Sequence, residues 1–179
     1  MSDQAVQPVG ESVTTARLLD GRLATMRFLR EDDADAVYAL HDQLSDHDRY
    51  FRFFTLRPVG LREVVGALTG QADGVCAVGA FDSGRLIGVA HYTVGGADPE
   101  TAEVAVLVAH DDHSRGVGTA LLNRLTEIAR SHGVRRFVAE VLGENHLMLT
   151  VFSELGWRCS PTGECSVRHL EFQLCEQDS

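Results

Sequence analysis

The stretch of sequence that decides the fold is Glu103-Val-Ala-Val-Leu-Val-Ala-His-Asp-Asp-His-Ser-Arg-Gly-Val-Gly-Thr119. Its first part is apolar and rich in valine, which is typical of a buried strand. The first turn of a helix has unpaired N–H donors and a partial positive charge, so a loop leading into one is a candidate site for a diphosphate. Such a helix is predicted here, because apolar residues recur with helical spacing at Val117, Ala120, Leu121, Leu125, Ile128 and Ala129.

Three phosphate-binding patterns compete for this loop. A P-loop requires the lysine of GxxxxGK[ST], and all 16 Lys and Arg residues of the chain are arginine. A dinucleotide-binding GxGxxG loop requires a third glycine, which is missing after Gly116 and Gly118. What remains is a polar residue followed by x-x-Gly-x-Gly, here His113-Ser114-Arg115-Gly116-Val117-Gly118. Taken alone, this pattern also fits a glycine-containing helix start that binds no ligand.

The rest of the chain predicts one mixed α/β domain. Asp20-Gly21 and Asp82-Ser83-Gly84 separate paired strand patterns and predict hairpin turns. Residues 1–14 lack periodicity and predict a flexible arm, followed by a single domain over residues 15–175. The expected strands are Ala16–Leu19, Leu23–Leu29, Val75–Phe81, Leu86–Val94, Ala102–Val108, Phe137–Leu142 and Val167–Leu174, and the expected helices begin near Glu31, Ser45, Leu61, Val117 and His146.

Composition and charge narrow the function. The chain has 179 residues, of which 44% are hydrophobic, and no apolar run long enough to span a membrane. It shows no signal peptide, and its four cysteines form no CxxC pair, so we expect a cytoplasmic protein with reduced thiols and no zinc ribbon. The formal net charge of -10 argues against nucleic-acid partners and favours cationic acceptors such as amines or basic peptides.

The segment from Glu103 through Trp157 resembles the core of the GNAT family of N-acetyltransferases. It contains an acidic strand start, the glycine loop, an amphipathic helix, a strand and then Asn145-xx-Met148-xxx-Phe152-xx-Leu155-Gly156-Trp157. A second segment, Leu44–Phe54, is similar to one found in bacterial protein-lysine acetyltransferases that act on acyl-CoA synthetases. The resemblance covers roughly residues 16–174. It implies a mixed α+β fold, in which a mostly antiparallel central sheet is splayed at a cofactor cleft and flanked by helices.

The resemblance also implies a binding mode for acetyl-CoA as co-substrate. The molecule would lie in a V-shaped opening between the strand ending at Val108 and the strand Phe137–Leu142. Asn145 and Phe152 would border its thioester end. Its pantetheine arm would pair with the backbone of Val106, Leu107 and Val108, and its diphosphate would be held by His113, Ser114, Arg115, Gly116, Val117, Gly118 and Thr119.

Two positions depart from the family pattern. His113 occupies a position that is usually Gln or Arg, and Phe152 replaces a tyrosine that is proposed in many relatives to protonate the leaving thiolate. Phenylalanine cannot donate a proton, so we expect water to protonate the CoA thiolate, or the thiolate to leave as the anion. Glu103 is the preferred general base for the attacking amine, and Glu140 on the neighbouring strand is the next candidate.

Other reactive residues carry less weight. His110, Asp111, Asp112 and His113 resemble a metal cluster but lie in the loop that the cofactor would occupy, so we expect no metal. Cys76 lies within an apolar strand pattern and is expected to be core. The leading hypothesis is therefore direct transfer of acetyl from acetyl-CoA to an amine, with a protein lysine, for example of an acyl-CoA synthetase, as the favoured acceptor. The alternatives are a small-molecule or amino-acid N-acetyltransferase and a non-catalytic acyl-CoA-binding regulatory protein.

Overall fold

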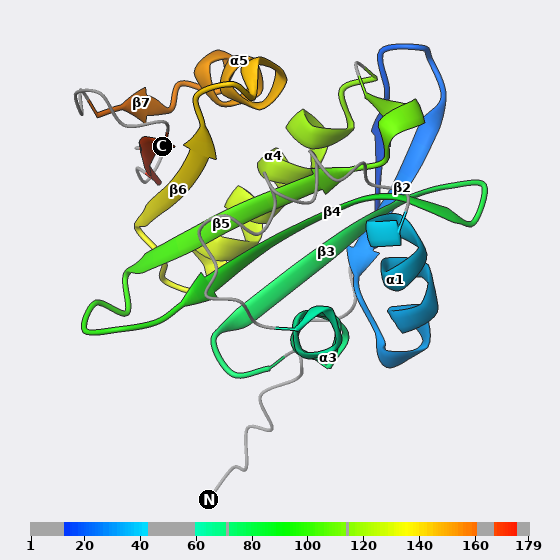
Figure 1. Ribbon diagram of the computed structural model, residues 1–179, viewed down its shortest axis with the longest axis horizontal. Coiled ribbons are helices and arrows are strands. Elements are labelled where there is room, and N and C mark those ends of the chain that lie inside the picture. The colour runs from blue at the N-terminus through cyan, green and yellow to red at the C-terminus, as the bar shows by residue number, and fades with distance from the viewer. Residues whose placement is uncertain (1–12, 43–59, 71, 114, 161–166, 175–179) are drawn as a thin grey trace, which may run out of the picture.

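The computed structural model describes residues 13–42, 60–70, 72–113, 115–160 and 167–174. They form an eight-stranded sheet with helices on both faces (Figure 1). The strands are β1 (Thr14–Arg17), β2 (Leu23–Phe28), β3 (Val75–Asp82), β4 (Arg85–Val94), β5 (Thr101–Val108), β6 (Arg136–Leu142), β7 (Arg158–Cys159) and β8 (Val167–Gln173). The helices are α1 (Ala34–Asp42), α3 (Leu61–Thr69), α4 (Val117–Ser131) and α5 (His146–Glu154), with 3₁₀ turns η1 (Glu31–Asp33) and η2 (His110–Asp112).

The strands lie in the order β1-β2-β3-β4-β5-β6-β8-β7. Neighbours pair antiparallel throughout, except that β5 and β6 run parallel. A parallel neighbour requires a crossover, and α4 provides it on one face of the sheet. This arrangement confirms the expected mixed α+β fold with a mostly antiparallel sheet flanked by helices, and it adds one parallel junction between β5 and β6.

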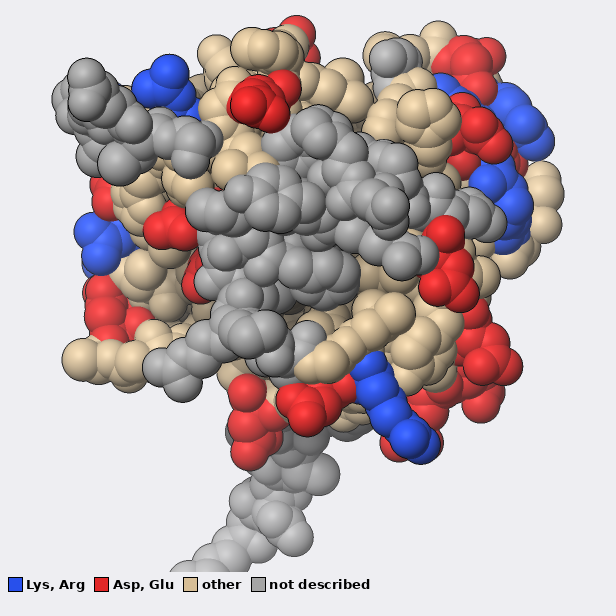
Figure 2. Space-filling model, in the orientation of Figure 1, with Lys and Arg blue, Asp and Glu red and all other residues tan. Residues whose placement is uncertain are grey.

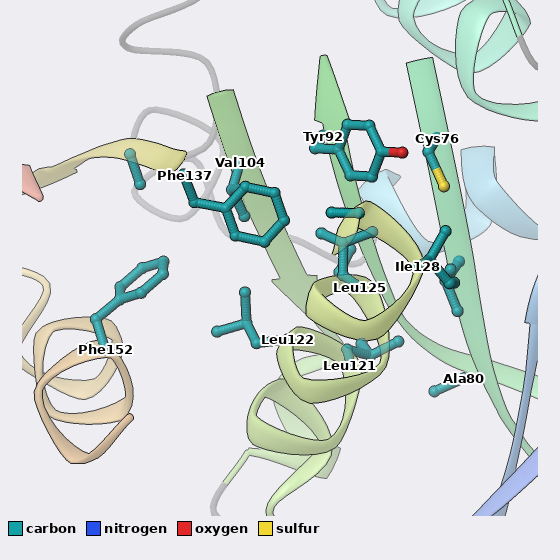
Figure 3. Close-up of a cluster of buried hydrophobic side chains, with 14 of the residues drawn as sticks. Cys76, Ala80, Tyr92, Val104, Leu121, Leu122, Leu125, Ile128, Phe137 and Phe152 are labelled. Carbon is teal, nitrogen blue, oxygen red and sulfur yellow. The ribbon is translucent and has the colours of Figure 1, made fainter. Parts of the chain in front are cut away.

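Two hydrophobic clusters cover opposite faces of the sheet. On one face α4 packs its buried stripe against β3, β4 and β5, and Figure 3 shows Leu121, Leu122, Leu125 and Ile128 pointing at the strands. On the other face α1 and α3 lie in front of the sheet in Figure 1 and pack on β3 and β4. Because side chains alternate along a strand, the cluster to which a residue belongs tells which face it points to.

The expected elements differ from the structure in a few places. Thr14, which the sequence placed in the N-terminal arm, is the first residue of β1 and pairs with Met26. The expected helix near Glu31 begins as the 3₁₀ turn η1. η2 and the two-residue strand β7 were not predicted, because elements this short have no periodicity. The arm over residues 1–12, the helix start at Ser45, the segment Leu44–Phe54 and Cys165 lie outside the described residues.

Across the described ranges, no helix is long and apolar enough to span a membrane.

Leu125 provides a test of this packing. Its side chain is 0% exposed between α4 and the sheet, so we expect Leu125→Ala to lower the free energy of unfolding by about 2–5 kcal/mol through lost burial and a cavity. Leu23→Ala is the matched control, because Leu23 is 57% exposed and its loss should cost no more than about 0.5 kcal/mol. Urea unfolding measures both values. Equal losses in the two variants would show that α4 does not cover the core.

Candidate active site

β5 and β6 separate soon after they meet. Their pairing consists of Thr101↔Arg136, Ala102↔Phe137 and Glu103↔Val138, and both strands then continue, to Val108 and to Leu142. Over the same length β5 stays paired with β4 as far as Gly88↔Val108. The edge of β5 that faces β6 therefore offers backbone N–H and C=O groups to a ligand, which could pair with it like an added strand.

A cavity of about 390 Å³ occupies this opening. It is lined from β5 by Val104, Val106 and Val108, which point toward α4, and also by Ala105 and Leu107, which point the other way. The cavity therefore passes between the strands from one face of the sheet to the other. Its remaining walls come from the loop before α4, the middle of β6 and α5.

The N-terminus of α4 opens into this cavity. Gly116, the N-cap, has φ +83, a left-handed conformation that favours glycine. Among the described residues, no side chain caps this helix end and its first turn holds no acidic residue. A Cβ placed on Gly118 would lie 3.8 Å from Val108 and 4.0 Å from Val151, between β5 and α5. The N–H donors of a first helical turn, at positions where glycine adds no side chain of its own, fit a diphosphate.

The side chain of His113 lines the cavity and reaches back to the end of β5. Its Nε2 lies 2.9 Å from the carbonyl oxygen of Val108. This contact closes the loop onto the strand with which the resemblance associates the pantetheine arm. Val117, Gly118 and Thr119 also line the cavity, whereas Ser114 lies outside the described residues.

Arg115 points away from the cavity. Its guanidinium donates to the carboxylates of Asp20, at 2.7 Å, of Asp82, at 3.1 Å, and of Asp112. Hydrogen bonds from Arg115 hold the pKa of Asp82 below its ordinary value, and those from the aspartates, Asp20 foremost, raise the pKa of Arg115 further. The resemblance assigned this residue to the diphosphate. In the structure its guanidinium forms ion pairs with three carboxylates instead.

α5 forms the wall opposite the loop. Asn145 caps the helix by accepting from the backbone N–H of Met148 at 3.1 Å, which fixes the turn that enters the cavity. Phe152 lines the cavity from a buried position, 2% exposed, and its ring centroid lies 4.5 Å from that of Trp157. Trp157 also stacks on Phe137 of β6, with 6.0 Å between the ring centroids, and through it α5 is held against β6.

The two candidate bases share one face of the sheet. Glu103 is the register partner of Val138, and Glu140 follows two residues later on β6, so both project on the face opposite α4. Glu103 is exposed at the point where the strands part, next to Val104 and Ala105 of the cavity wall. Glu140 lines the cavity itself and has His169 at 3.9 Å.

Two of the loop residues that resemble a metal cluster make other contacts in the structure. Asp112 is 2% exposed and accepts from both Arg85 and Arg115, and His113 contacts Val108. Within the described ranges, no group of three or more His, Cys, Asp or Glu residues is arranged to hold a metal ion.

Two exposed leucines are among the cavity-lining residues that sequence reasoning missed. Leu19, in the β1–β2 turn, is 81% exposed and Leu147, in the first turn of α5, is 44% exposed. Leu147 belongs to a motif that was recognised, so its position could have been read from the helix. Leu19 is distant in sequence from the loop that it contacts, so no local pattern identifies it.

Comparison with known proteins agrees with this geometry. Residues 26–157 match the acetyltransferase (GNAT) family. The chain is 33% identical to the crystal structure of the GNAT domain of S. lividans PAT, covering 90% of this chain and 96% of that domain, with a TM-score of 0.81. It is 26% identical to the acetyltransferase PA5475 of Pseudomonas aeruginosa over 77% of this chain and 76% of the relative. It is 37% identical to the acetyltransferase Pat of Mycolicibacterium smegmatis over 41% of this chain, but spans only 22% of that protein.

The splayed sheet and the glycine loop at the N-terminus of α4 are consistent with the family that the comparisons identify. The chain belongs to the acetyltransferase (GNAT) family.

Thiol reactivity tests the placement of the cysteines. Burial raises the pKa of the Cys76 thiol to about 11, with the Tyr92 hydroxyl acting weakly in the other direction. At pH 8 only about one Cys76 in a thousand is then a thiolate, whereas Cys159 is exposed. We expect iodoacetamide to modify Cys159 within minutes and Cys76 only after denaturation, as measured by peptide mass spectrometry. Modification of native Cys76 at the same rate as Cys159 would contradict its burial.

Proposed function

We propose that this protein transfers the acetyl group of acetyl-CoA directly to an amine, and that a lysine of a protein is the favoured acceptor. The observation that carries the proposal is the separation of β5 from β6 against the uncapped start of α4. Membership of the family supports the reaction class. A solved relative, the putative acetyltransferase yncA from Salmonella typhimurium, is titled as a complex with its cofactor acetyl-CoA; it is 19% identical, has a TM-score of 0.69 and covers 87% of this chain.

The donor would be held by backbone more than by side chains. The unpaired edge of β5, including Val106, Leu107 and Val108, suits the amides of a pantetheine arm, and the first turn of α4 suits the diphosphate. Asn145 and Phe152 would border the thioester, which supplies the activated acetyl group. Backbone recognition suits an acidic protein, since it places positive ends of dipoles at the anion without a cluster of basic side chains.

The acceptor must lose a proton before it attacks. A lysine amine has a pKa of about 10.4, so the neutral form costs about 4–5 kcal/mol at pH 7. Glu103 stands where β5 and β6 part, on the face opposite α4, and is exposed to an incoming amine. We assign it the role of general base, directly or through a water. Glu140 is the competing assignment, because it lines the cavity.

No hydroxyl is available at position 152 to return a proton to sulfur. Phe152 is buried against Trp157, so its ring closes the cavity without taking part in proton transfer. We infer that water protonates the CoA thiolate, or that the thiolate leaves as the anion, since the pKa of a free thiol is only about 8.5. Cys76 is buried beside Tyr92, outside the cavity lining, which agrees with direct attack rather than a covalent thiol intermediate.

The preference for a protein lysine rests on three observations. The chain is 33% identical to the GNAT domain of S. lividans PAT over 90% of its length. Its net charge is -10, and acidic side chains are spread around the face that Figure 2 shows, which attracts cationic acceptors at long range. The Leu44–Phe54 segment resembles that of protein-lysine acetyltransferases. The same proposal includes a cytoplasmic location, because the enzyme would have to share a compartment with acetyl-CoA and with the acyl-CoA synthetases that it modifies.

Release of CoA tests the base. We expect Glu103→Gln to reduce acceptor-dependent CoA release from acetyl-CoA by about 10²–10⁴-fold, with little change in acetyl-CoA binding. Glu140→Gln should have a much smaller effect. Glu127→Gln is the control, because the Glu127 side chain on α4 is 62% exposed. A larger loss in Glu140→Gln than in Glu103→Gln would reverse the assignment of the base.

The same assay identifies the acceptor class. Purified acyl-CoA synthetase is compared with free amines and amino acids, and because the enzyme has no lysine, acetyl-lysine signal comes only from the added protein. Faster release with free amines would replace the protein-lysine proposal by small-molecule acetylation. Acetyl-CoA binding without release from any acceptor would favour a regulatory binding protein.

Gly118 tests the donor site. The methyl groups of Gly118→Val would project into the space between β5 and α5, so the Kd of CoA should rise at least about tenfold, equivalent to about 1.4 kcal/mol. Gly66→Val is the matched control, because a Cβ at this exposed α3 position meets nothing within 4 Å. Calorimetric titration gives both Kd values. Wild-type affinity in Gly118→Val would show that CoA does not pass between β5 and α5.

A further inference from the structure

Arg115 joins three parts of the chain that are distant in sequence. Its guanidinium contacts Asp20 in the β1–β2 turn, Asp82 at the end of β3 and Asp112 in η2. The arginine itself directly precedes Gly116, the N-cap of α4. The loop that enters the cavity is thus tied through one side chain to both neighbouring turns.

Two of the carboxylates that pair with Arg115 are buried, so leaving them without a cation would cost free energy. The side chains of Asp112 and Asp82 are 2% and 5% exposed. Arg85 contacts Asp112 at 3.1 and 3.2 Å, and Arg22 contacts Asp82 at 3.2 Å, but these two arginines are mostly exposed, at 55% and 60%. Arg115 is only 14% exposed, so it is the most buried cation of the group. Its removal would leave buried negative charge beside the start of α4.

Backbone and apolar contacts also connect the β1–β2 turn to the loop before α4. The N–H of Leu19 donates to the carbonyl oxygen of Arg115 at 2.9 Å. The Leu19 side chain lies over Gly116, where an added Cβ would be 3.2 Å from its Cγ, and it also lines the cavity. In Figure 2 acidic and basic side chains interleave at the upper right, where Figure 1 places the β1–β2 turn. The β1–β2 turn and the loop before α4 are therefore joined by a backbone hydrogen bond, an apolar contact and an ion pair.

We propose that Arg115 is a positioning residue, which sets the loop before α4 for the diphosphate of the donor by neutralising Asp82 and Asp112 and not by contacting the phosphates. Three arginines and three aspartates make the group formally neutral. The positive end of the α4 dipole then acts on the diphosphate without opposition from the buried carboxylates. This role rests on the proposed function, since it assumes that a CoA thioester is the donor.

The test compares ligands with and without the diphosphate. Arg115→Met keeps the length of the side chain and removes its charge, and Kd values are measured by titration with CoA and with pantetheine, which lacks the diphosphate. We expect the Kd of CoA to rise at least about tenfold and that of pantetheine to change less than about twofold. Arg135→Met, which removes an exposed arginine paired with Glu100, is the control and should leave both unchanged.

Asp82→Asn in the Arg115→Met background separates neutralisation from direct contact, and it serves also if Arg115→Met alone does not fold, because a buried charge is removed together with its partner. If Arg115 acts by neutralising the carboxylates, the double variant binds CoA at least about threefold more tightly than Arg115→Met, or within about threefold of the wild type where the single variant does not fold. If Arg115 reaches the phosphates directly, the double variant binds CoA at least about tenfold more weakly than the wild type and no better than Arg115→Met, and the proposal is overturned. Equal losses for CoA and pantetheine in Arg115→Met also overturn it. Failure of the wild-type protein to bind CoA would instead reject the proposed function.

Discussion

The backbone of β5 is satisfied by β4 along one edge from Ala102 to Val108, but β6 leaves its other edge after Glu103. Buried peptide groups need partners, and a strand edge left open inside a sheet is costly unless a ligand or solvent completes it. The rest of the site depends on this opening. Stacking of Phe137, Trp157 and Phe172, with Phe152 beside them, holds α5 and β6 together on the far side, so the opening cannot close by simple collapse.

The chemistry of the site is divided between the two faces of the sheet. The start of α4, with its free N–H groups, lies on one face, and Glu103 and Glu140 project from the other. The proposed polyanionic donor and cationic acceptor would therefore approach surfaces of suitable charge, although the whole chain carries -10. In this proposal, local dipoles and a neutral arginine–aspartate group make the separation possible within a strongly acidic domain.

Much of the fold was predictable because its signals are local. Strand alternation, the α4 stripe and the glycine loop were all read within a few residues of their true bounds, and the resemblance of the segment through Trp157 indicated an opening between β5 and β6. The direction of the Arg115 side chain was not predictable, because two of its three carboxylate partners, Asp20 and Asp82, lie 95 and 33 residues away in the chain. Leu19 was missed for the same reason. The sequence alone left Glu103 and Glu140 as alternatives, and their shared face explains why spacing does not separate them.

The stacked aromatic group has an optical consequence. The chain contains a single tryptophan, Trp157, which is 7% exposed and lies in contact with Phe152 of the cavity wall. Its indole emission therefore arises from one environment, directly behind the Phe152 wall of the cavity. A molecule that displaces the Phe152 ring would alter this environment, so the protein carries an intrinsic fluorophore next to its cavity without any attached label.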